Sequence, residues 1–187
     1  MPLQSRVSPF GELFATSARG TVMGNRGGRL HDAQRKLSAR RWVNRAWICC
    51  KLTFNDRHRK VWGNSYTELF FLDEVTAFAA GHRPCFECRR KDAERFALLF
   101  SGKTQRTPAA VMDEILQAER LDGKAKRSHR TKLDSLPDGA MISMAARIAQ
   151  KIDHRLLRLV THLRPRTFVR VNMYQLATKR GVATEQV

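Results

Sequence analysis

The stretch Phe70–Arg90, FFLDEVTAFAAGHRPCFECRR, determines the fold that we expect for this chain. It begins on the end of an apolar run, and Asp73 is a suitable N-cap for a short helix over Glu74–Ala80. Gly81 stands where many helices end on a left-handed residue, and Pro84 prevents the helix from continuing. The sequence therefore predicts a strand, a short helix and a tight turn in succession.

Two cysteines occupy the turn that follows. Cys85 and Cys88 have the CxxC spacing that lets two thiolates bind one tetrahedral metal, as in structural zinc sites. Arginines before and after the motif favour the thiolate form that a metal requires. A redox pair and two unrelated thiols are the alternatives, but no thioredoxin-like strand–helix–strand pattern precedes the motif. The motif therefore predicts a Zn²⁺ site.

Two further cysteines, Cys49 and Cys50, are adjacent within the β-favouring run Trp47–Phe54. Neighbouring residues of a strand point to opposite faces, so we expect one of them to bind the metal and the other to lie in the core. The remaining ligand is expected from a histidine or a carboxylate, and His31 is the best histidine candidate, ahead of His58 and His82. For each of these histidines, the alternative is an ordinary surface or hydrogen-bonded side chain.

These signals indicate an α+β fold, with a small antiparallel sheet and helices around a cysteine-rich zinc site. The sheet is expected from residues 47–54, 60–62 and 68–72, and further helices from about Arg89 to Phe100 and from a Thr107 cap with Pro108 at the first position. Apolar residues at helical spacing over residues 140–163 predict a basic amphipathic helix. We divide the chain into four parts: a basic Gly/Arg-rich segment (1–45), a zinc module with its following helices (46–121), a basic linker (122–138) and a basic helical tail (139–187).

Charge points to a polyanionic partner. The 187 residues carry a formal net charge of +18, and residues 1–46 and 139–187 each contain nine basic and two acidic residues. A nearly neutral module between basic ends suits contact with backbone phosphates, so we expect nucleic acid, and DNA in particular, as the partner. The candidate phosphate-binding residues are Arg26, Arg29, Arg40, Arg41, Arg83, Arg89, Arg90, Lys126, Arg127 and Arg130. Basic ends that only confer solubility are the alternative.

The turn and its flanking helices resemble the second half of the Ada-type zinc-binding module of methylphosphotriester repair proteins. The matching residues are Ala79-Ala80-Gly81, Arg83-Pro84-Cys85 and Cys88, which reproduce an AAG-x-RPC-x-x-C loop between a short helix and a longer one. About 140 residues at the start of the chain also resemble a group of uncharacterised bacterial proteins. The first resemblance implies a zinc ion held by thiolates and a role at DNA.

The chain departs from that family in its first half. Ada-type modules carry two thiols in a C-R-P-S-C element, one of them a methyl acceptor, whereas Cys49 and Cys50 are adjacent here. We therefore expect a zinc-stabilised nucleic-acid-binding protein that acts on DNA in repair or regulation. The alternatives are a repair enzyme or nuclease with a possible thiolate methyl acceptor, and a structural zinc adaptor for protein partners. No apolar run long enough to span a membrane and no secretion signal is recognised, so we expect a cytoplasmic protein without membrane contact.

Overall fold

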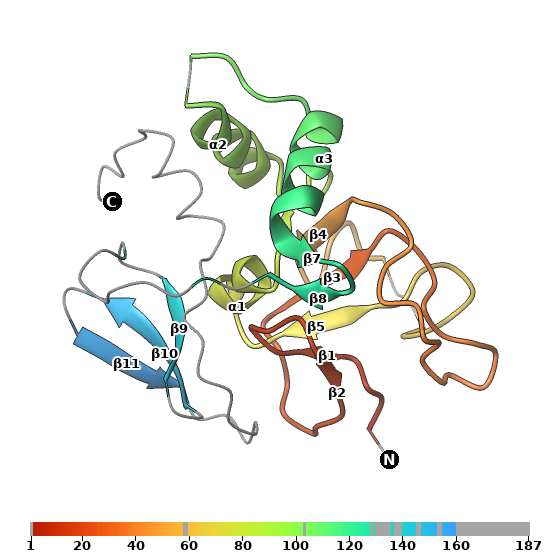
Figure 1. Ribbon diagram of the computed structural model, residues 1–187. Helices are drawn as coiled ribbons and strands as arrows, with labels where there is room; N and C mark the ends of the chain where they lie inside the picture. Colours follow the sequence, from red (N-terminus) through yellow and green to blue (C-terminus); the bar gives the residue numbers. More distant parts are fainter. Residues whose placement is uncertain are drawn as a thin grey trace.

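The computed structural model describes residues 2–57, 60–102, 104–127, 129, 136, 140–144, 147–152 and 155–159. Within them the chain has an α+β fold, in which a mixed sheet is accompanied by three helices (Figure 1). The α+β expectation is confirmed at this level. None of the helices in the described part is long and apolar enough to cross a membrane.

The main sheet has six strands in the order β2-β1-β5-β3-β4-β6. Its strands are β1 (Arg6–Val7), β2 (Leu13–Phe14), β3 (Val22–Arg26), β4 (Trp47–Cys50), β5 (Leu69–Phe71) and β6 (Arg83–Pro84). Neighbouring strands run antiparallel except for the pairs β1–β5 and β4–β6.

This topology corrects the expected sheet. Strand β4 pairs with β3 and β6 rather than with a strand at residues 60–62, which contain none, and the sheet is mixed rather than antiparallel. Strands β1 to β3 precede residue 46, so the boundary that we drew there falls within the sheet. Residues 55–56 after β4 do form a turn, but a loop follows it instead of the expected strand.

The three helices follow the sequence signals closely. Helix α1 (Glu74–Ala79) is capped by Asp73, whose carboxylate accepts a hydrogen bond from the Thr76 amide at 2.7 Å. Gly81 has a φ of +94°, the left-handed conformation expected after a helix. Helices α2 (Arg90–Ser101) and α3 (Ala109–Arg120) follow, and α3 starts one residue later than expected, with Pro108 at its N-cap.

Two apolar clusters hold these elements together. One lies between the sheet and α1 and contains Cys49, Leu69, Phe71 and Ala77, all fully buried. The other joins α2 to α3 and consists of Phe96, Ala97, Phe100, Met112 and Leu116. The turn that carries Cys85 and Cys88 lies between β6 and α2, so both clusters restrict its position.

The C-terminal part differs from the expectation. A hairpin of β7 (Leu121–Asp122) and β8 (Ala125–Lys126) lies in the expected linker, and β9 (Met141–Met144), β10 (Arg147–Ile152) and β11 (Arg155–Leu159) form an antiparallel sheet. The helix predicted over residues 140–163 is therefore wrong for the described part of that range. Residues four apart share a face in a helix and in a strand alike, so apolar spacing did not separate the two. Residues 160–187 lie outside the described part.

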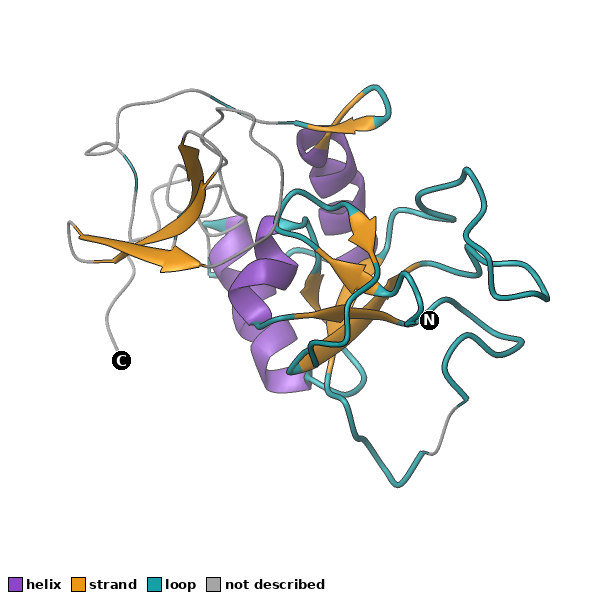
Figure 2. Ribbon diagram, turned by 90° about the horizontal axis from the view of Figure 1, so that it is seen from below, coloured by secondary structure: helices purple, strands orange, loops and turns teal. Residues whose placement is uncertain are grey.

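Two long loops project on the side of the molecule opposite the β9–β11 sheet (Figures 1 and 2). The first joins β3 to β4 and spans residues 27–46, and the second joins β4 to β5. They contact each other, because the Thr67 amide donates to the Gly28 carbonyl at 3.1 Å and the Leu30 amide donates to the Thr67 hydroxyl at 2.7 Å.

Candidate metal centre

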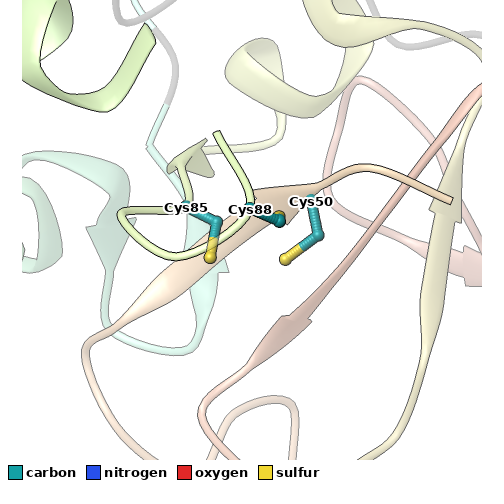
Figure 3. A group of neighbouring side chains, drawn as sticks. All are labelled: Cys50, Cys85 and Cys88. Carbon is teal, nitrogen blue, oxygen red and sulfur yellow. The ribbon is translucent and has the colours of Figure 1, made fainter. Parts of the chain in front are cut away.

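Three cysteine side chains converge at one end of β4. The sulfur atoms of Cys50, Cys85 and Cys88 all lie within 4.8 Å of one another, and Figure 3 shows Cys50 on the strand facing the two turn cysteines. Thiolates bound to one tetrahedral zinc at about 2.3 Å lie roughly 3.8 Å apart. The three sulfur atoms would therefore need to move only slightly closer together to bind one zinc ion. The residues therefore fit a thiophilic metal ion.

Strand alternation separates the adjacent thiols. Cys50 points into the cluster, whereas Cys49 is 0% exposed on the opposite face and packs against Leu69 and Phe71. The Cys85 amide also donates to the Cys49 carbonyl at 3.0 Å, which fixes the turn to the strand through the backbone. Cys49 thus supports the site through its backbone carbonyl, whereas its sulfur is not part of the cluster.

Hydrogen bonds around the turn distribute charge unevenly among the thiols. A hydrogen bond from Cys50, assisted by the backbone of residues 87 and 88 and opposed by burial, lowers the pKa of Cys85 to about 5. The Cys50 pKa is raised by that same hydrogen bond and by burial, and burial raises the Cys88 pKa. Burial raises the pKa of Cys49 to about 12, although Arg89 nearby opposes it. These hydrogen bonds favour the thiolate form at Cys85 over Cys50 and Cys88.

A fourth ligand is not supplied by the residues that the structure describes, since the group of close metal-binding side chains contains only the three cysteines. His31, our preferred histidine, lies elsewhere: its Nδ1 is 2.6 Å from the Thr67 hydroxyl and its Nε2 is 3.0 Å from the Gly63 carbonyl. The His31 ring also stacks on Trp62, with centroids 5.1 Å apart. The structure thus does not bring His31 together with the three cysteines, and its ring instead joins the two long loops.

The other two histidine candidates do not complete the site. His82 is fully buried between Trp47 and Phe71, and burial together with nearby Arg26, Arg120 and Lys126 lowers its pKa well below the usual value. It belongs to the opposite side of the sheet from Cys50. His58 lies outside the described residues.

A cavity of about 310 Å³ opens beside the three thiols. Its walls come from β3, β4, β5, the β4–β5 loop and the cysteine turn. Besides the three cysteines, the residues that line it are Met23, Asn25, Ile48, Lys51, Leu52, Phe54, Arg57, Val61, Tyr66, Glu68, Phe70 and Glu87. Most of this surface is apolar or aromatic. A volume of this size is at the lower end of those that hold small organic ligands.

Three of the arginines expected at phosphates are engaged inside the protein, which corrects that assignment. Arg26 is 2% exposed, donates to the Gly11 carbonyl at 2.9 Å and lies 4.2 Å from the Trp47 ring centroid. Arg83 forms a buried ion pair with Asp113. Arg89 forms ion pairs with Glu74 and Asp92 and donates to the Cys49 sulfur at 3.5 Å.

The other expected cations lie at or near the surface. Exposed residues among them are Arg29, Arg40, Arg41, Arg90 and Arg127, while Lys126 is half-buried and Arg130 lies outside the described residues. Five of the ten candidates are thus exposed, as contact with phosphates requires.

Two structural residues were missed from the sequence. Asp113 lies beside Met112 in the apolar stripe of α3, and an acid inside such a stripe is a signal of a buried ion pair. Arg120 places its guanidinium 4.6 Å from the Trp47 centroid, on the ring that Arg26 also contacts, and no sequence pattern indicates these two contacts.

Comparison of the chain with protein-family models, with curated proteins and with solved structures found no match. The functional argument therefore depends on the geometry of the molecule itself.

Proposed function

We propose that this protein is a zinc-stabilised nucleic-acid-binding protein directed at DNA. Cys50, Cys85 and Cys88 would hold the zinc, because a set of converging sulfur donors favours thiophilic ions over Mg²⁺ or Ca²⁺. The zinc would join β4 to the turn before α2, and so stabilise the sheet from which the two long loops project.

The nucleic-acid part of the proposal rests on the exposed cations of the loop over residues 27–46, which we call the basic loop. It contains six cations, Arg29, Arg35, Lys36, Arg40, Arg41 and Arg45, and one acid, Asp32. All six cations are exposed, and Arg45 alone among them forms an ion pair with a described carboxylate, that of Glu114. Exposed, unpaired cations in one loop suit contact with successive phosphates.

The basic loop is held in shape by hydrogen bonds within the loop, to which the Arg41 guanidinium contributes by donating to the Ser38 carbonyl at 2.9 Å. The Asp32 carboxylate accepts hydrogen bonds from the Gln34 and Lys36 amides at 3.0 and 2.8 Å, and the Ser38 amide donates to the Leu30 carbonyl at 2.8 Å. At its base, the Asn44 amide group donates to the Gly27 carbonyl at 3.1 Å. A loop already ordered loses less conformational entropy when it binds.

Salt dependence of DNA binding tests the proposal. A variant with Arg29, Arg35, Lys36 and Arg40 changed to Gln is compared with a control in which four exposed cations outside the loop, Arg19, Lys91, Arg95 and Lys124, are changed to Gln. Each phosphate contact contributes about 0.9 to the slope of log affinity against log salt for duplex DNA, so four lost contacts should reduce the slope of the loop variant by about 3.6.

Both variants lose the same formal charge, so a general charge effect would reduce their slopes equally. Equal slopes in the two variants would contradict a role for the basic loop. If the wild-type protein has no salt-dependent affinity for duplex or single-stranded DNA, the proposal is wrong and a structural zinc adaptor for protein partners becomes the better account.

A further inference from the structure

We propose that the fourth coordination position of the thiolate site is open to the cavity beside it and takes a planar, neutral nitrogen heterocycle. This inference rests on the metal site of the proposed function and assigns the ligand that the site accepts. Cys50, Cys85 and Cys88 both form the cluster and line the cavity, while no described residue adds a fourth donor. Three protein ligands and an accessible position are typical of zinc sites that bind an exogenous molecule.

Charge favours a neutral donor. Three thiolates and one divalent ion sum to −1, and the cavity lining adds two cations, Lys51 and Arg57, and two carboxylates, Glu68 and Glu87, which cancel. The Arg57–Glu87 pair is formed at 2.6 Å, and Glu68 accepts the Trp62 amide at 2.7 Å. An anionic donor would raise the local charge to −2 inside a partly buried site, whereas a heterocyclic nitrogen would leave it unchanged.

Shape and composition favour a flat ring. Phe54, Tyr66 and Phe70 lie among the aliphatic side chains of the lining, and such walls accept planar rings by stacking and by burial of apolar surface. Lys51 is exposed at the cavity, and its side chain forms no ion pair with a described residue. A mostly apolar cavity that holds both the three thiols and Lys51 fits a neutral nitrogen ring that carries a phosphate substituent.

The basic loop contacts the β4–β5 loop, which forms one wall of this cavity. His31 belongs to that loop, and it stacks on Trp62 and is hydrogen-bonded to Gly63 and Thr67, which come from the loop that walls the cavity. A nucleic-acid strand held by the basic loop would therefore pass close to the cavity entrance. The heterocycle has two possible sources: an unpaired base of a bound strand, or a free small molecule with the same ring chemistry.

The test uses the full chain loaded with Co²⁺, whose visible absorption bands report the ligands of a tetrahedral site. We titrate it with 1-methylimidazole as the probe and expect a saturable spectral change. Leu52→Trp places a large ring at the cavity wall, and Leu72→Trp is its matched control, since the two leucines are 47% and 48% exposed and Leu72 does not line the cavity. We expect Leu52→Trp to weaken probe binding by about tenfold or more and Leu72→Trp to leave it unchanged.

Two further titrations distinguish the sources. A spectral change with a purine-rich single strand, absent with the same strand made abasic, assigns the site to a nucleobase, and a change with the free probe alone assigns it to a small molecule. A spectrum of four thiolates that 1-methylimidazole does not alter would overturn the inference and leave the proposed function standing. So would equal probe affinity in Leu52→Trp and wild type. Failure to bind Co²⁺ or Zn²⁺ at all would overturn both.

Discussion

The guanidinium of Arg83 donates two hydrogen bonds to the carboxylate of Asp113, from Nε to Oδ1 at 2.7 Å and from Nη2 to Oδ2 at 2.6 Å. The two side chains are 6% and 10% exposed, and the pair joins the strand that leads into the cysteine turn to helix α3. A second ion pair of the same helix, Arg45–Glu114 at 3.0 Å, is 62% and 69% exposed. The same helix thus offers a buried pair and an exposed one for comparison.

We expect Asp113→Ala to lower the free energy of unfolding by about 3–5 kcal/mol, because it leaves the Arg83 charge buried without a partner. Glu114→Ala on the same helix should cost about 1 kcal/mol or less, since its pair is screened by water. Urea denaturation of both variants measures the difference. Similar losses in the two would contradict the buried character of the Arg83–Asp113 pair.

Arg89 provides a test of the distinction between structural and phosphate-binding arginines. It joins α1 to α2 through Glu74 and Asp92, so we expect Arg89→Gln to lower the free energy of unfolding by about 1–2 kcal/mol. The salt slope of DNA binding should stay as in the wild type, because the side chain is mostly buried. A decrease in slope of about one unit would show instead that Arg89 reaches a phosphate.

Metal binding should release one proton for each of the three thiols that is protonated before the metal binds. At pH 7 Cys85, with a pKa of about 5, is already a thiolate, whereas Cys50 and Cys88 have raised pKa values and are protonated. All three must be thiolates to bind the ion, so about two protons should leave per metal bound, and affinity should rise with pH through neutrality.

Calorimetric titrations with Zn²⁺ in buffers of different ionisation enthalpy count these protons. Release of three protons would mean that Cys85 has an ordinary pKa. Release of fewer than about two would mean that Cys50 or Cys88 is not a ligand.

Local signals predicted the parts of this fold that depend on neighbouring residues. The Asp73 cap, the left-handed Gly81 and the three helices up to Arg120 are present within a residue or two of the expected positions. Strand alternation also placed one of Cys49 and Cys50 with the turn cysteines, although sequence alone left open which of them it was.

Pairing over long distances was not predictable in the same way. The partner of β4 is β3, across a twenty-residue loop, and nothing local in Trp47–Cys50 specifies it. The burial of Arg26 and Arg83 has the same origin, since an arginine shows its role through partners such as Gly11 and Asp113 that lie far away in the sequence.

We infer that Cys50, Cys85 and Cys88, and not Cys49 or His31, form the metal site. Native mass spectrometry of freshly purified wild type, Cys50→Ala, Cys49→Ala and His31→Ala, with and without chelator, tests it most directly. We predict one zinc in the wild type, in Cys49→Ala and in His31→Ala, and loss of the zinc in Cys50→Ala while circular dichroism checks that each variant is folded. Retention of zinc in a folded Cys50→Ala protein, or its loss from folded Cys49→Ala, would contradict the account.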